Sequence, residues 1–252
     1  MNLPPEFLLF APLIALLAYT VFGMTGFGSV VIAMPLLVQV LPLKFAVPLV
    51  LLLDGVLVLW AGARYRRLAH FREIALLLPF IVAGTLVGVG LLITLDEQLA
   101  LGVLGIFVLG YGAYCLSRPV MSAQIARGWA APLGFAGGVF GALYGTGGVI
   151  YVVYLARRIA DKSELRATVA VVLTISVALR LVLFGYSGLL QQEGLIFAWL
   201  LLLPAGALGM WLGNRLHHKL PNTTVMRVVY VLLVFSGVLL LLRVLMTSGH
   251  LG

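Results

Sequence analysis

Hydrophobic residues form long, nearly uninterrupted segments along this chain, and polar residues are confined to short stretches between them. The apolar segments cover residues 7–22, 30–41, 45–63, 74–94, 98–116, 129–143, 149–156, 167–185, 195–213 and 223–243. Most are close to the roughly 20 residues that a helix needs to cross a bilayer. The pattern therefore predicts an all-α polytopic membrane protein.

A glycine-rich stretch interrupts the apolar pattern twice, at matching places in the two halves of the chain. The first copy is GMTGFGS at residues 23–29, and the second is GALYGTGG at residues 141–148. Glycine destabilises a helix interior by roughly 0.5–1 kcal/mol, so clustered glycines predict a break in the helix. The four arms that flank the two breaks are each expected to be too short to span the membrane.

Composition places the protein in a membrane and excludes other classes. Only 10% of its 252 residues are charged and its mean hydropathy is +1.17, whereas a soluble domain carries about 25% charged residues. The net charge of +8 lies in short loops, and no long polar stretch could form a nucleic-acid-binding surface. We expect an integral protein of the bacterial cytoplasmic (inner) membrane, in contact with lipid, with no nucleic-acid partner and no cofactor.

The loops between the apolar segments divide by charge into two groups. Residues 64–72, 117–128, 157–166 and 215–219 are basic, whereas residues 95–97 and 186–194 contain no Lys or Arg. Basic loops remain in the cytoplasm, so these four should lie there and both termini should lie outside. The number of membrane crossings agrees with these loop positions if residues 7–41 and 129–156 are hairpins that enter from opposite faces of the membrane. A full crossing by residues 7–41 violates the charge pattern only mildly, so that alternative stays open.

This topology predicts two inverted-topology repeats, each a glycine-broken helical hairpin followed by three transmembrane helices. The first repeat covers residues 1–117, a cytoplasmic linker covers 118–128, and the second repeat covers 129–252. Matching helix breaks in two halves of a chain indicate the substrate site of a transporter. The oligomeric state, monomer or homodimer, is left open by the sequence.

At the two glycine-rich stretches the chain resembles the TauE/SafE family of sulfite and organosulfonate exporters. The matching segments are Gly26-Phe27-Gly28-Ser29 with Met34-Pro35-Leu36, Gly145-Thr146-Gly147-Gly148, and the helix start Arg166-Ala167-Thr168. Ser29 stands where the family has a third glycine, and Val153-Tyr154 where it has a proline. The resemblance covers nearly the whole chain. It implies a permease that exports a small sulfur-containing anion, sulfite or an organosulfonate such as sulfoacetate, driven by an ion gradient.

The two glycine breaks are the candidate site for an anionic substrate. Half-helices that begin near Ser29 and Gly148 would direct unpaired backbone N–H groups and the positive end of a helix dipole at an anion. We expect Gly147 to face a cavity near the bilayer midplane, opposite Gly28. The predicted binding residues are Thr25, Gly26, Phe27, Gly28, Ser29, Tyr144, Gly145, Thr146, Gly147 and Gly148. The alternative is that these glycines only allow close helix packing.

Two ionisable side chains inside apolar segments extend this site. An ionisable group within the membrane is a functional hypothesis by default. We expect Arg180 to bind the negative charge of the substrate and Asp54 to carry a coupling proton. The alternative is a structural pair, or an Arg180 near the outer end of its helix that reaches the membrane surface beside a hydrated Asp54.

The sequence gives no support for an enzyme or a metal site. It contains neither an H-E-x-x-H nor a G-x-S-x-G motif, so no catalytic residue is assigned. His217 and His218 are adjacent, and adjacent residues of a helix do not share a face, so no metal ligands are assigned either. The alternatives to a secondary transporter are a passive small-anion channel and a membrane-embedded scaffold or enzyme that acts on lipid.

Overall fold

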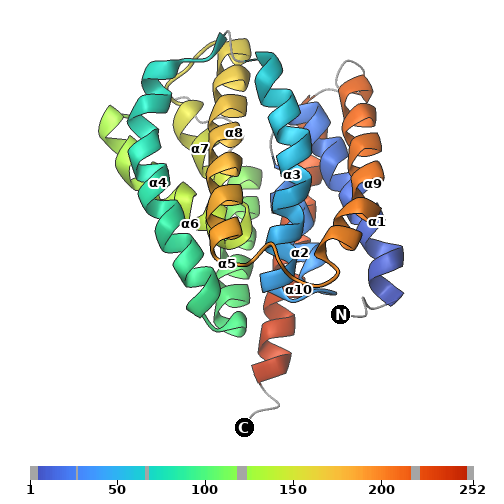
Figure 1. Cartoon of the computed structure of the whole chain (residues 1–252). Coiled ribbons are helices and arrows are strands. Elements are labelled where there is room, and N and C mark those ends of the chain that lie inside the picture. Colours follow the sequence, from blue (N-terminus) through green and yellow to red (C-terminus); the bar gives the residue numbers. More distant parts are fainter. Residues whose placement is uncertain (1–4, 27, 66–67, 118–123, 217–221, 249–252) are drawn as a thin grey trace.

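The computed structural model describes residues 5–26, 28–65, 68–117, 124–216 and 222–248, and it is built from helices joined by short turns (Figure 1). The helices are α1 Pro5–Thr25, α2 Ser29–Leu37, α3 Leu43–Tyr65, α4 Phe71–Thr94, α5 Glu97–Ser117, α6 Ala130–Tyr144, α7 Gly147–Leu155, α8 Lys162–Tyr186, α9 Leu195–Leu216 and α10 Asn222–Ser248, with a short 3₁₀ turn at Arg127–Trp129. Five of the described helices, α1, α4, α5, α8 and α9, are long and apolar enough to cross a membrane. The all-α membrane architecture is therefore confirmed.

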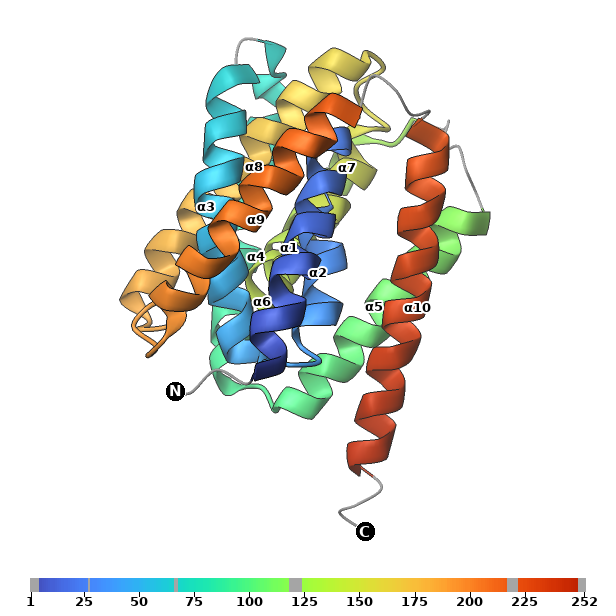
Figure 2. The ribbon, with the colours of Figure 1, turned by 90° about the vertical axis from the view of Figure 1, so that its right-hand side faces the viewer.

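Polar contacts join the connections between helices into two groups, one at each end of the bundle. At one end Lys44 Nζ donates to the Ile93 carbonyl, and Gln192 Nε2 donates to the Lys44 carbonyl, both at 2.8 Å. At the other end the His70 backbone N–H donates to Thr168 Oγ1 at 2.9 Å. The start of α1 and the end of α10 lie at the first of these ends (Figure 2). We call it the terminal end, and the opposite one the basic end.

The first hairpin differs from the sequence expectation in the length of its first arm. Helix α1 has 21 residues and is a candidate membrane span, so the prediction of an arm too short to span is wrong for this segment. The helix continues through Gly23 because that glycine is a packing position. A Cβ there would lie 2.5 Å from the Met210 carbonyl and 3.0 Å from Gly213 Cα of α9. Helix α2, with nine residues, is short as expected.

Helix α8 begins earlier than the apolar pattern indicates. Residues 157–166 read as a loop in the sequence, but the helix starts at Lys162. The reason is an N-cap, because Asp161 Oδ1 accepts from the backbone N–H groups of Ser163 and Glu164, both at 2.9 Å. Arg166 therefore stands on a helix, one turn inside its start.

Glycines allow two helix pairs to approach closely. Gly84 and Gly88 of α4 lie against α6, where Gly84 touches the Phe135 carbonyl and a Cβ on Gly88 would lie 2.6 Å from the Val139 carbonyl. Gly209 and Gly213 of α9 lie in the same way against the backbone of α1. In lipid such close packing supplies much of the attraction between helices.

Gly88→Val is expected to lower stability without a specific effect on substrate recognition. The new side chain must push α4 away from the α6 backbone, and overpacking of this kind typically costs about 1–3 kcal/mol. Thermal unfolding in detergent measures the loss. Gly90→Val is the matched control, because a Cβ there meets nothing within 4 Å. Equal midpoints for the two variants would contradict the packing role of Gly88.

A polar network at the basic end ties α4 to α7. The buried Glu73 carboxylate accepts from Tyr154 Oη at 2.7 Å and from Arg158 Nη2 at 3.0 Å. The hydrogen bond to Glu73 raises the pKa of the Arg158 guanidinium above its usual value. Arg158 Nη1 also donates to the Ile125 carbonyl at 3.1 Å. The basic loops are thus partly fixed by a buried carboxylate, and are not only solvated charge.

Candidate functional site

Each predicted break is a real interruption between two helices. Helix α1 ends at Thr25 and α2 begins at Ser29, and both Gly26 and Gly28 have positive φ, +82° and +90°. Between α6 and α7, Gly145 has φ +77°. Only glycine adopts this left-handed conformation at no steric cost. The glycines therefore allow the chain to reverse direction at both places.

The two breaks meet in the interior of the bundle. Val30 of α2 lies against Gly145, so that a Cβ on Gly145 would be 2.6 Å from Val30 Cγ1 and 3.6 Å from Arg180 Nη1. A cavity of about 30 Å³ lies between α2, α3, α7 and α8. Its lining is Phe22, Gly28, Ser29, Val30, Val31, Asp54, Val58, Gly145, Thr146, Gly148, Val149, Leu173, Val177 and Arg180. Since a water needs about 10–15 Å³ by this measure, the cavity has room for about two.

Arg180 is the cation of this cavity. It is only 3% exposed, so it lies inside the bundle and not on its surface. Nη1 donates to the Gly141 carbonyl at 2.8 Å, at the last turn of α6, where a cation opposes the negative end of the helix dipole. A guanidinium has five N–H donors, so this bond leaves donors for an anion in the cavity.

Asp54 lies on the α3 wall of the same cavity and is 4% exposed. Tyr19 Oη of α1 donates to its Oδ1 at 2.8 Å. Within the described residues no ion pair joins Asp54 to Arg180, although both line the cavity. The alternative that Asp54 and Arg180 form a structural pair therefore lacks a direct contact between them. Each side chain can still bind a proton or a ligand.

The structure brings together seven of the twelve predicted site residues. Those that line the cavity are Gly28, Ser29, Gly145, Thr146, Gly148, Asp54 and Arg180. Phe27 lies outside the described residues. The remaining four, Thr25, Gly26, Tyr144 and Gly147, have their contacts elsewhere.

Those four residues make identifiable contacts away from the cavity. Thr25 Oγ1 donates to the Val21 carbonyl of its own helix at 2.8 Å, and Tyr144 Oη donates to the Ala100 carbonyl of α5 at 2.7 Å. A Cβ on Gly26 would lie 3.3 Å from Arg166 Nε. Gly147 contacts the Gly137 carbonyl of α6, and a Cβ there would also lie 2.9 Å from Gly141 Cα. The expectation that Gly147 faces the cavity is therefore wrong, and Gly148 takes that place.

Sequence reasoning missed Tyr19 and the apolar walls of the cavity. Leu173 and Val177 stand four residues apart on α8, and Arg180 follows three residues later, so the three share a helix face. A Cβ on Gly148 would lie 2.8 Å from Leu173 Cδ2. Tyr19 could have been found, because a hydroxyl in an apolar segment needs a partner, and Asp54 is an ionisable group in a nearby apolar segment.

Comparison with known proteins gives two matches. The model of the family described as "Sulfite exporter TauE/SafE" matches residues 11–240. A protein of Comamonas testosteroni named "Probable inner membrane transporter protein TsaS" is 32% identical over 191 residues, which are 75% of this chain and 80% of that protein. No solved structure matches the chain.

Proposed function

Because this chain belongs to the TauE/SafE family of sulfite exporters and is an integral protein of the inner membrane, we propose that it is a secondary transporter. Its substrate is a small sulfur-containing anion, sulfite or an organosulfonate such as sulfoacetate. The export is driven by an ion gradient. The observation that carries the proposal is Arg180, a buried cation in a cavity between two helix breaks.

The electrostatics of the cavity favour an oxyanion. The guanidinium of Arg180 forms a planar fork that matches the oxygen atoms of a sulfonate or sulfite. Thr146 and Ser29, which are 1% and 3% exposed, bring hydroxyl groups to the same cavity. Ser29 is the first residue of α2, so the N–H groups of that first turn also favour a negative charge. The substrate-binding residues are those of the cavity lining.

The size of the cavity supports a carrier more than a passive channel. The cavity has room for about two waters, fewer than the four heavy atoms of a sulfite ion, so its walls would have to move to admit one. Leu173 of α8 lies against Gly148, and Arg166 of the same helix lies against Gly26. Alternating exposure to the two sides is the behaviour of a carrier.

We also propose that residues 1–117 and 129–252 are inverted-topology repeats joined by the segment 118–128. The packing supports this, because α1 lies against α9 as α6 lies against α4, while α3 pairs with α8 and α5 with α10. Under this scheme the pairs α3–α8 and α5–α10 each join equivalent helices of the two halves, and the pairs α1–α9 and α6–α4 are equivalent to each other. The first hairpin enters from the terminal end, which faces the periplasm, and the second from the basic end, which faces the cytoplasm.

Flux in proteoliposomes tests the function. Vesicles loaded with sulfite or sulfoacetate should release the anion when an ion gradient is imposed, at a rate that saturates with substrate. Asp54→Asn should remove the response to a proton gradient while exchange of anion for anion continues. Conductance far above carrier turnover would instead show a channel, and absence of anion flux with either substrate would refute the proposal.

Cysteine labelling tests the orientation. In a Cys115→Ala background, Gln191→Cys should react with an impermeant maleimide added outside cells, because Gln191 is exposed at the terminal end. Arg72→Cys, exposed at the basic end, should react only after the cells are opened. The reverse labelling pattern would contradict the orientation, and labelling of both residues from outside would contradict the inverted arrangement.

A further inference from the structure

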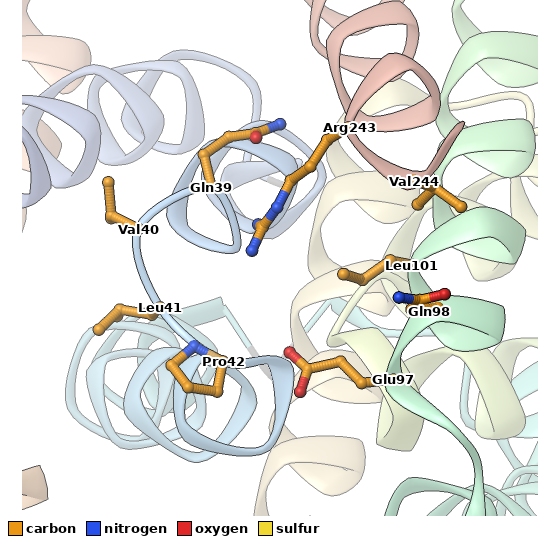
Figure 3. A pocket seen from close by; sticks show the side chains of 9 residues that line it. All are labelled: Gln39, Val40, Leu41, Pro42, Glu97, Gln98, Leu101, Arg243 and Val244. Atoms are coloured by element: carbon orange, nitrogen blue, oxygen red, sulfur yellow. The ribbon is translucent and has the colours of Figure 1, made fainter. Parts of the chain in front are cut away.

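A second and much larger cavity opens at the terminal end, away from the site described above. Its volume is about 370 Å³, against about 30 Å³ for the central one. Small-molecule sites typically have about 300–1,000 Å³. The lining comes from the α2–α3 turn, the first turns of α5 and the last turns of α10: Gln39, Val40, Leu41, Pro42, Glu97, Gln98, Leu101, Arg243 and Val244 (Figure 3).

Opposite charges stand on two sides of this cavity. Arg243 extends from α10 into the space beside the α2–α3 turn, and Glu97 of α5 lies on the facing side (Figure 3). Each side chain also holds one end of the turn. Arg243 Nη1 donates to the Val38 carbonyl, at the end of α2. Glu97 Oε1 accepts from the Leu43 backbone N–H, at the start of α3, at 2.8 Å.

Two amide side chains, Gln39 and Gln98, add neutral hydrogen-bonding groups to this cavity. Gln39 lies beside Arg243 (Figure 3), and its Nε2 is buried without a hydrogen-bond partner. A buried donor without an acceptor costs free energy, and a rotation of the Gln39 amide toward the cavity would let an anionic oxygen there recover it. Gln98 stands next to Glu97 and also lines the cavity (Figure 3). The Arg243 side therefore offers donors, and the facing side offers the Glu97 carboxylate as an acceptor.

We propose that this outer cavity binds a zwitterion, with its anionic oxygens on Arg243 and Gln39 and its ammonium group on Glu97. A simple anion would be repelled by Glu97, and a simple cation by Arg243, in a partly desolvated space where such repulsion is strong. The apolar parts of Val40, Leu41, Pro42, Leu101 and Val244 accommodate the carbon chain between the two charges.

Two sources could supply this chemistry. One is a small free zwitterion of the amino-acid type. The other is the phosphoethanolamine head group of a lipid. The surface of α10 around Arg243 is apolar and exposed at Leu242, Leu245 and Met246, by 44%, 68% and 68%, and acyl chains could lie there.

Binding to the purified full-length protein tests the proposal. The soluble probes are glycerophosphoethanolamine and β-alanine, compared with glycerophosphate and ethanolamine, each of which carries only one of the two charges. A zwitterion should raise the thermal unfolding midpoint and bind at least about tenfold more tightly than either single-charge probe, which corresponds to about 1.4 kcal/mol. Equal binding of all four probes, or binding of none, would overturn the proposal.

Three variants locate the site. Arg243→Gln and Glu97→Gln each remove one charge but keep an amide that can still hold the α2–α3 turn. Gln39→Leu removes an Nε2 that has no partner, so the fold should not depend on it. Each variant should weaken zwitterion binding about tenfold, whereas Arg215→Gln, an exposed change at the basic end, should not. Unchanged affinity in all three would show that Arg243 and Glu97 only cap the turn, and would overturn the proposal.

Native mass spectrometry then separates the two sources. Retention of phosphatidylethanolamine over phosphatidylglycerol, lost in Arg243→Gln and Glu97→Gln, supports a lipid head group. Retention that does not differ between the variants, together with variant-sensitive β-alanine binding, supports a free zwitterion. Neither result depends on sulfite flux, so the failure of this proposal and the failure of the proposed transport function are distinguishable.

Discussion

Arg180→Gln is expected to reduce anion export at least about 100-fold. Removing one charge of a buried, hydrogen-bonded charge pair typically costs about 2–5 kcal/mol, and each 1.4 kcal/mol is tenfold in affinity. In this protein the pair would consist of the guanidinium and the bound anion. Glutamine can still donate to the Gly141 carbonyl, the present partner of Nη1, so the contact with α6 can survive the change.

The measurement is sulfite flux in proteoliposomes, with thermal unfolding recorded on the same preparations. Arg215→Gln is the matched control, because Arg215 is exposed and stacks on the Trp211 ring with its guanidinium carbon 4.0 Å from the ring centroid. Arg180→Lys should retain part of the flux, since it keeps the charge but loses the planar fork. Similar, small losses in Arg180→Gln and Arg215→Gln would remove Arg180 from the site.

The helix breaks could be predicted from the sequence because their cause is local. Glycine density at residues 23–29 and 141–148 is a property of a few neighbouring residues, and the positive φ of Gly26, Gly28 and Gly145 is its direct consequence. The assignment of Arg180 and Asp54 also needed no geometry, because an ionisable group in an apolar segment is costly unless it has a function or a partner.

The direction in which an individual residue points could not be predicted in the same way. Successive residues of a helix are rotated by about 100°, so Gly147 and Gly148 point in different directions although both open α7. The orientation depends on how α7 docks on α6, a tertiary contact that leaves no local signal. The length of α1 escaped prediction for a similar reason. Gly23 counts as a helix breaker in the sequence, but its contact with α9 makes it a packing residue.

The different roles of Gly147 and Gly148 lead to opposite outcomes for the same substitution. Gly147→Ala should lower stability by about 1–3 kcal/mol, because the new methyl group meets the backbone of α6 at Gly137 and Gly141, which cannot yield without moving a helix. Gly148→Ala should fold normally and reduce sulfite flux at least about tenfold. Its methyl group meets only the flexible end of Leu173, with a Cβ to Cδ2 distance of 2.8 Å, at a wall of a cavity with room for about two waters.

A double-mutant cycle distinguishes a filled cavity from a distorted helix. Leu173→Ala removes the side chain that the new methyl group displaces, so Gly148→Ala with Leu173→Ala should recover much of the flux that Gly148→Ala loses. The coupling should be specific to this pair. The effects of substitutions at residues in contact are non-additive, whereas the effects at residues without shared partners add. Leu173→Ala should therefore not rescue the stability of Gly147→Ala. If Gly148→Ala transports normally, or if Gly147→Ala is as stable as the native protein, the geometry assigned to α7 is wrong and the cavity beside Arg180 is not the path of the anion.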